Sequence, residues 1–113
     1  MIRVFFWQDA DGKLVGLSVK GHADFAPKGE DIICAGVSAL AQTAGLSLEQ
    51  QLSETPEVVI EEGSLECFLP ATISPAGRGK AQVILKTIAI GLEAIADVHQ
   101  GYVKVEYKTR PRQ

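Results

Sequence analysis

"GHADFAPKGEDIICAGVSAL", residues 21–40, holds the change from extended chain to helix around which this sequence is organised. Its first half, 21–30, is rich in Gly, Pro and charged residues, which interrupt regular structure and predict a loop. Asp31 then precedes an apolar run, the position that a helix N-cap takes. We therefore predict a loop over 21–30 and a helix over about 32–52, with Cys34 in its first turn.

The predicted helix has one apolar side and one side of small residues. Apolar residues recur at spacings of three and four, which is typical of a buried helical stripe. This stripe consists of Ile33, Val37, Leu40, Ala44 and Leu48. The face that carries Cys34 and Ser38 also holds Ala41, Gln42 and Gly45. Another backbone or a ligand is able to approach such a face closely.

Two strands are predicted before this stretch. "IRVFFW" is rich in β-branched and aromatic residues, and the "DADG" that follows contains a hairpin turn signal. "LVGLSVK" then alternates, with Leu14, Gly16 and Ser18 on one face and Val15, Leu17 and Val19 on the other. The chain thus opens with a β-hairpin that ends at Gly21 and His22.

The second half of the chain repeats the same kinds of element. "VVIEE" and "SLECFL" flank Gly63 and predict a second hairpin, and "PATISPAGRGK" reads as a loop. A second helix over about 80–100 is apolar nearly all round, so we expect it to be buried on more than one side and to support a homodimer. "YVKVEYK" is the final predicted strand.

These elements predict a small protein of the α/β (α+β) class. Their order is ββαββαβ, which we expect to form a mostly antiparallel sheet with two long helices. The chain has 113 residues, of which 46% are hydrophobic and 22% charged, a composition typical of one globular domain. We therefore assign residues 1–113 to a single domain.

Charge, hydropathy and cysteine spacing bound the possible partners. The net charge of −3 argues against a dedicated nucleic-acid binder, and the basic tail with Lys108, Arg110 and Arg112 fits a solvated terminus better than a binding patch. No run of 18 apolar residues and no signal peptide is apparent, so we expect a cytoplasmic protein without a membrane segment. Cys34 and Cys67 then remain thiols, and their separation matches no metal or cofactor pattern.

Cys34 and His22 form a candidate pair for nucleophilic catalysis. A catalytic thiol needs its pKa lowered, and both a helix N-terminus and a nearby imidazole have that effect. Cys34 is the third residue of the predicted helix, and the loop over 21–30 is able to return the chain close to His22. Asp31 has two open roles at this point, namely capping the helix or orienting His22.

Structural roles are the alternatives for these residues. A lone cysteine is more often a small core residue than a nucleophile, and Cys67, inside a predicted strand, is expected to be only that. His99 is placed in the last turn of the second helix, where its partial positive charge is favourable. Spacing alone therefore does not decide the role of Cys34.

The stretch over 21–40 resembles the signature of the ribosomal-processing cysteine protease family, Prp. That signature is Gly-His, a short loop with Gly, and then D-I-[IV]-C-A-[AG]-V-S. Its positions are matched by Gly21, His22, Asp31, Cys34, Ala35 and Ser38. The resemblance extends to the length of the chain and to the order of its elements.

The resemblance implies a dimeric cysteine protease that removes a short N-terminal extension from bacterial large-subunit ribosomal protein twenty-seven. The cut falls next to hydrophobic and aromatic residues of that extension. Cys34 would be the nucleophile and His22 the general base, with Asp31, Ser38 and Gly21 as supporting residues. We further expect an amide of the helix N-terminus, such as that of Cys34, to stabilise the oxyanion.

Two other functions remain as alternatives, a non-catalytic module that binds the ribosome and a thiol-based redox sensor that uses Cys34. Neither needs proteolysis. In the protease reading, the loop over 23–30 would act as a mobile cover for the substrate, with Gly21 and Gly29 as hinges.

Overall fold

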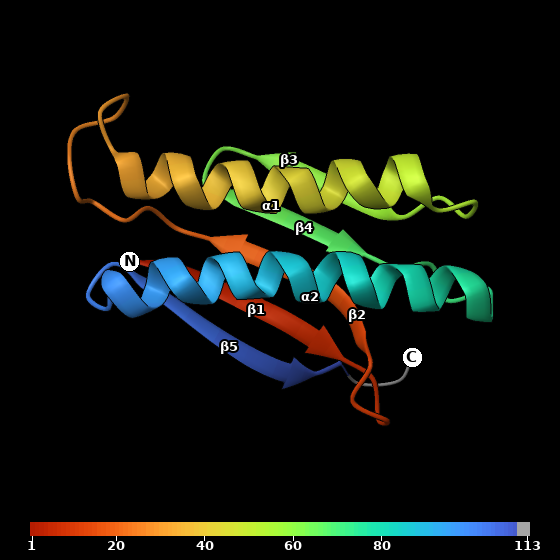
Figure 1. The fold of residues 1–113 in the computed structure, drawn as a ribbon. Helices are drawn as coiled ribbons and strands as arrows, with labels where there is room; N and C mark the ends of the chain where they lie inside the picture. The colour runs from red at the N-terminus through yellow and green to blue at the C-terminus, as the bar shows by residue number, and fades with distance from the viewer. Residues whose placement is uncertain (111–113) are drawn as a thin grey trace.

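The computed structural model describes residues 1–110 and confirms the predicted order of elements. The strands are β1 (Ile2–Gln8), β2 (Leu14–Lys20), β3 (Glu57–Glu61), β4 (Ser64–Phe68) and β5 (Val103–Thr109). The helices are α1 (Ile32–Gln51) and α2 (Pro75–Val98). Figure 1 shows the two helices lying side by side across the sheet.

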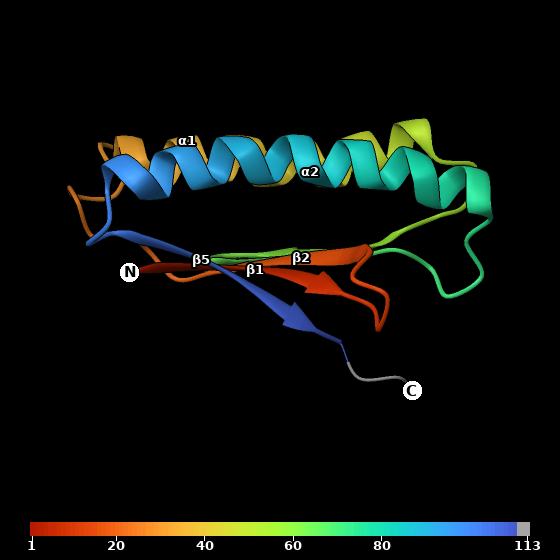
Figure 2. The same cartoon turned by 60° about the horizontal axis from the view of Figure 1, so that its bottom comes forward.

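The five strands form one sheet in the order β3-β4-β2-β1-β5. Every neighbouring pair is antiparallel except β1 and β5, which run parallel, so the sheet is mostly antiparallel as predicted. Both helices cover the same face of this sheet, and the other face is open (Figure 2). The end of β2 and the β3–β4 turn therefore meet the start of α1 at one end of the molecule.

The core lies between the helices and the covered face of the sheet. Its largest fully buried side chains include Phe6, Leu17, Leu48, Leu85 and Leu92. Truncation of a buried Leu or Phe to Ala costs about 2–5 kcal/mol, so these positions dominate stability. On α1 the buried stripe contains Ala41 in place of the predicted Leu40, which is only half-buried.

On the open face of the sheet, more residues of β2 are buried than the alternating pattern of its sequence predicted. Gly16 and Ser18 are buried although they point away from the helices, because the rings of Trp7 and Phe68 lie over them. Trp7, which is half-buried, donates its indole Nε1–H to the buried Ser18 Oγ at 2.8 Å, so the buried hydroxyl has a partner. Aromatic side chains thus take over, on this face, the covering role that a helix layer has on the other.

Two residues of the predicted basic tail pack on this aromatic surface. Lys108 lies 4.4 Å from the centre of the Phe5 ring, and Arg110 lies 4.0 Å from that of Phe68. Cations over ring faces are attracted by the ring quadrupole. Arg112, the third residue of the tail, lies outside the described residues.

Helix α2 begins five residues earlier than predicted, at Pro75 rather than near 80. The sequence "SPAG" suggested a loop, but Pro is well tolerated at the first helical position, where its missing N–H costs nothing. Ser74 caps the helix by accepting the Gly77 N–H at 3.1 Å, and Glu54 accepts the Ser74 N–H at 2.7 Å. At the other end His99 is the C-cap and not part of the last turn.

Helix α1 is apolar enough to qualify as a membrane span by length and composition alone. The expectation of no such segment rested on the lack of an unbroken apolar run, yet a window of α1 has a mean hydropathy of 1.3. A single helix of this kind is weak support for a span, because core helices have the same properties. The buried side of α1 packs on the sheet through residues such as Val37 and Leu48.

Candidate active site

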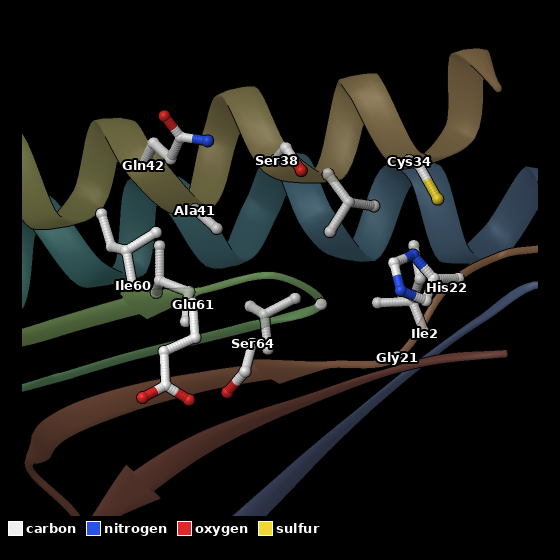
Figure 3. Close-up of a pocket in the computed structure, with 14 residues that line it drawn as sticks. Ile2, Gly21, His22, Cys34, Ser38, Ala41, Gln42, Ile60, Glu61 and Ser64 are labelled. Carbon is white, nitrogen blue, oxygen red and sulfur yellow. The ribbon is translucent and has the colours of Figure 1, made fainter. Parts of the chain in front are cut away.

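Cys34 and His22 line one cavity at the end of the molecule where α1 begins. The cavity has a volume of about 120 Å³ and lies between α1, the end of β2 and the β3–β4 hairpin. Figure 3 shows the sulfur of Cys34 projecting from the first turn of α1 toward the imidazole of His22. Gly21 and Ser38 line the same cavity, whereas Asp31 does not. Four of the five predicted site residues therefore share one space.

The sulfur of Cys34 accepts a hydrogen bond from the loop. The backbone N–H of Ala23 donates to Cys34 Sγ at 3.2 Å. Ala23 follows His22 directly and is buried, and the bond itself is part-buried. The loop thus brings both a candidate base and a hydrogen-bond donor to Cys34.

Asp31 caps α1 and also anchors the loop. Its Oδ1 accepts the N–H groups of Ile33 and Cys34, each at 3.0 Å, and its Oδ2 accepts the Phe25 N–H at 3.0 Å. These bonds, the one from Cys34 N–H foremost, hold the pKa of the Asp31 carboxyl below its usual range. The capping role is confirmed. The hydrogen bonds that Asp31 makes within residues 1–110 do not include one from His22.

The amide of Cys34, which we expected to stabilise an oxyanion, already has an acceptor in this structure. That N–H is already donated to Asp31 Oδ1, as is the N–H of Ile33. An N-cap carboxylate and a substrate oxyanion compete for the same amides, and here the carboxylate occupies them. A donor in another part of the cavity would avoid this competition.

The β3–β4 turn is the part of the site that sequence analysis missed. Gly63 accepts the Gly21 N–H through its carbonyl at 2.9 Å, and both glycines have positive φ, +72° for Gly63 and +94° for Gly21. A Cβ on Gly63 would stand 2.9 Å from His22 Nε2. The sequence showed Gly63 as a hairpin turn, but nothing in it indicated that the turn would lie against His22.

Glu62 adds a negative charge beside His22. Lys28 of the loop donates to Glu62 Oε1 at 2.9 Å, so an ion pair joins the loop to the β3–β4 turn. This ion pair is the main reason that the pKa of Glu62 is lowered, and the charge of His22 contributes as well. Both partners are largely exposed, at 87% and 76% of their side chains, which makes the pair weak.

Beyond the Cys34–His22 pair, the cavity is mainly apolar. Val37 and Ala41 of α1 face Ile60 and Leu65 of the hairpin across it. The predicted small-residue face of α1 lines this space, except for Gly45, which packs against Val58. Such a surface fits the apolar side chain of a peptide next to Cys34.

Cys67 has the structural role expected of it, whereas His99 follows the last turn of α2 as its C-cap. Cys67 is fully buried in β4, and burial raises the pKa of its thiol to about 12. A thiol in this state is a poor partner for disulfide exchange with Cys34. His99 lies outside the cavity, with its ring edge-on to Phe25 at 6.3 Å.

The sequence is similar to characterised proteins that are named ribosomal processing cysteine protease Prp. The ribosomal processing cysteine protease Prp of Staphylococcus aureus is 27% identical over 108 residues, covering 96% of this chain and all of that protein. The protein of the same name from Bacillus subtilis is 29% identical over 107 residues, covering 93% of this chain and 96% of the relative.

Solved structures of Prp superpose on nearly the whole of this chain. The crystal structure of Staphylococcus aureus Prp with a covalently linked product peptide superposes with a TM-score of 0.83 at 27% identity, covering 96% of this chain and all of that one. The same enzyme with a substrate peptide gives 0.78 at 26% identity, covering 96% of this chain and all of that one. The family model for cysteine protease Prp matches residues 1–104. Since that match covers almost the whole chain, the protein belongs to the cysteine protease Prp family.

Proposed function

We propose that this protein is an endopeptidase that removes the short N-terminal extension of bacterial large-subunit ribosomal protein twenty-seven during ribosome assembly. The observation that carries the proposal is the position of Cys34 Sγ, which accepts the Ala23 N–H in a cavity that His22 also lines. Cys34 is the nucleophile and His22 the general base. Membership of the Prp family supports the class of reaction, and the resemblance of the motif supports this substrate.

The reaction begins with transfer of the Cys34 thiol proton to His22. The thiolate then attacks the scissile carbonyl carbon, an S–C bond forms, and the carbonyl π electrons move to oxygen. When the tetrahedral intermediate collapses, the C–N bond breaks and His22 gives its proton to the leaving amine. Water, deprotonated by His22, finally hydrolyses the thioester and releases the thiol.

The shape of the cavity supports an apolar or aromatic residue next to the cut. The space between α1 and the β3–β4 hairpin is lined by Val37, Ala41, Ile60 and Leu65, so it favours a hydrocarbon side chain. Ser38 lies one helical turn after Cys34 and lines the same space, where its hydroxyl is available to the substrate backbone. We assign Ser38 a supporting role there.

The test is cleavage of a peptide that spans the extension and the first residues of the mature ribosomal protein. Wild-type protein should cut it once, beside an aromatic residue, as mass spectrometry of the products would reveal. Cys34→Ala and Cys34→Ser should abolish cleavage and keep the circular dichroism spectrum. If the wild type binds the peptide without cutting it, the result favours the ribosome-binding module. If it neither binds nor cuts the peptide but Cys34 is reversibly oxidised, the result favours the redox sensor.

We also propose that the protein works as a homodimer in the cytoplasm. Three apolar side chains on the outer side of α2 support this, Val83, Ile90 and Val98, which are 67%, 70% and 76% exposed. They recur at spacings of seven and eight residues and so lie along one side of the helix. Sedimentation at micromolar concentration should give twice the 12.1 kDa chain mass, and Ile90→Glu should shift it to the monomer. A wild-type monomer would contradict the proposal.

A further inference from the structure

The start of α1 does not supply the donor that the proposed reaction needs. A negative oxygen develops on the scissile carbonyl, and donors aimed at it are usually the largest contribution to catalysis of acyl transfer. Asp31 already accepts the N–H groups of both Ile33 and Cys34. The Ala35 N–H is donated to the Asp31 carbonyl at 3.1 Å, as part of the helix. Three amides of the first turn of α1, including that of Cys34 itself, are therefore already donated within the chain.

The N–H of Ala23 is the backbone donor that the structure aims at the nucleophile. It stands 3.2 Å from Cys34 Sγ. In the tetrahedral intermediate only the carbonyl carbon separates the sulfur from the oxyanion. A donor that faces the sulfur therefore reaches the oxygen after a small displacement, when the sulfur has given up its charge to the new bond.

The loop fixes the direction of this N–H through backbone strain. Asp24 has a φ of 56°, in the left-handed region that residues other than Gly rarely adopt. On either side of it, the Ala23 N–H points at Cys34 Sγ and the Phe25 N–H points at Asp31 Oδ2. Strain of this kind persists only where its surroundings fix it, and it is common at functional sites.

Packing beyond the loop holds Phe25 in place. Its ring lies edge-on to the ring of Tyr102, with centroids 5.3 Å apart, and to that of His99 at 6.3 Å. Asp31 therefore serves the site indirectly, because one oxygen caps α1 and the other anchors the loop that carries Ala23. The Ala23 N–H is therefore held beside the reacting atoms, and only a small displacement is needed during the reaction.

We propose that the backbone N–H of Ala23 is an oxyanion donor of this enzyme, an inference that rests on the proposed protease function. It stabilises the Cys34 thiolate before attack. As the S–C bond forms and the carbonyl π electrons move to oxygen, the N–H transfers its hydrogen bond from sulfur to that oxygen. It returns to sulfur when the thioester is hydrolysed.

The direct test exchanges the Ala23 N–H for an ester oxygen, by incorporating L-lactic acid at that position. The side chain is unchanged and one donor is lost. Ala71 is exposed and makes no hydrogen bond through its N–H in the described residues, so lactic acid there is the matched control. Removal of one oxyanion donor typically lowers kcat by about 10²–10³. We expect that loss at position 23 and none at position 71.

The rate of alkylation by iodoacetamide separates the oxyanion from the thiolate. Alkylation needs the thiolate but forms no oxyanion. We expect kcat/KM of the Ala23 ester, measured on its pH plateau, to fall at least tenfold more than its alkylation rate. Equal losses of kcat/KM and of the alkylation rate would show that the N–H stabilises only the thiolate. An unchanged kcat/KM would show that the N–H has no part in the reaction. Either result overturns the proposal.

A second pair of variants avoids the ester. Asp24→Gly tolerates positive φ, whereas Asp24→Val does not, so the first should keep kcat/KM within about threefold and the second should lose most of it. Retained activity in a folded Asp24→Val protein would also overturn the proposal. Failure of the protease function itself is distinguishable, because the unmodified protein would then leave the peptide uncut.

Discussion

Gly63 lies so close to His22 that a side chain there would displace the imidazole, since a Cβ at that position would stand 2.9 Å from His22 Nε2. The contact joins two elements that are far apart in the chain, the end of β2 and the β3–β4 turn. Gly63 has a φ of +72°, which only glycine adopts without cost. The β3–β4 turn therefore borders the imidazole on one side.

Gly63→Ala should impair catalysis more than stability. The new Cβ would push the imidazole aside, and a misplacement of about 1 Å can cost about 10²-fold in rate. Gly12→Ala is the matched control, because Gly12 has a φ of +80° and nothing within 4 Å of its Cβ position. Both variants should lose a similar amount of stability, about 1–2 kcal/mol. Equal kcat/KM for the two would show that Gly63 does not position His22.

His22→Ala should lower kcat/KM by about 10²–10⁴, the usual contribution of a general base. Substrate binding should persist, because His22 forms only one side of the cavity. Alkylation of Cys34 near neutral pH should also slow, since the imidazolium no longer stabilises the thiolate. Unchanged rates of cleavage and alkylation would exclude the Cys34–His22 pair.

Asp31→Asn separates the two functions of Asp31. The amide oxygen of Asn caps a helix nearly as well as a carboxylate, so α1 should persist. The amide nitrogen is a donor and would face the Phe25 N–H, which Oδ2 accepts at 3.0 Å. We expect a small loss of melting temperature and a larger loss of kcat through displacement of the loop. Full activity would show that the loop anchor is dispensable.

As pH falls, the stability of the wild type should decrease more steeply than that of Asp31→Asn. The pKa of Asp31 is held below its usual 3.8, mainly by the Cys34 N–H, so the folded state binds this proton less readily than the unfolded chain. The resulting stabilisation is complete above about pH 4 and disappears as pH falls through the lowered pKa. Melting temperatures measured from pH 6 to pH 2 should converge at the acidic end. Parallel curves would contradict this assignment.

Hydrogen exchange should divide the loop over 23–30 into two parts. The Ala23 and Phe25 amides are bonded to Cys34 and Asp31, so they should exchange slowly. The tip around Lys28 is held mainly by an exposed ion pair to Glu62, so it should exchange fast and slow down with bound peptide. Unchanged protection of the tip in the peptide complex would count against a covering role.

Local patterns in the sequence predicted most of the elements and the nature of the candidate site. Strand alternation, the turn residues and the Asp31 cap depend on neighbours within a few positions, so their physics can be read from the chain. The placement of Cys34 in the first turn of α1 followed from that cap. The start of α2 was missed because Pro75 and Gly77 suit a loop and a capped first helical turn equally well.

Only the tertiary structure decided what surrounds Cys34 and His22. The loop over 21–30 carries Ala23 to the sulfur, and the sheet order brings the β3–β4 turn to His22; both contacts join residues whose spacing has no periodic signal. Competition for donors also has to be seen in three dimensions, because Asp31 removes the Cys34 amide from the reaction and leaves the Ala23 amide. The sequence by itself, through the resemblance of its motif, identified Cys34 and His22 as the candidate reactive groups. The fold determined which of their hydrogen-bond partners remain available, since hydrogen bonds depend on distance and direction that only the packed chain fixes.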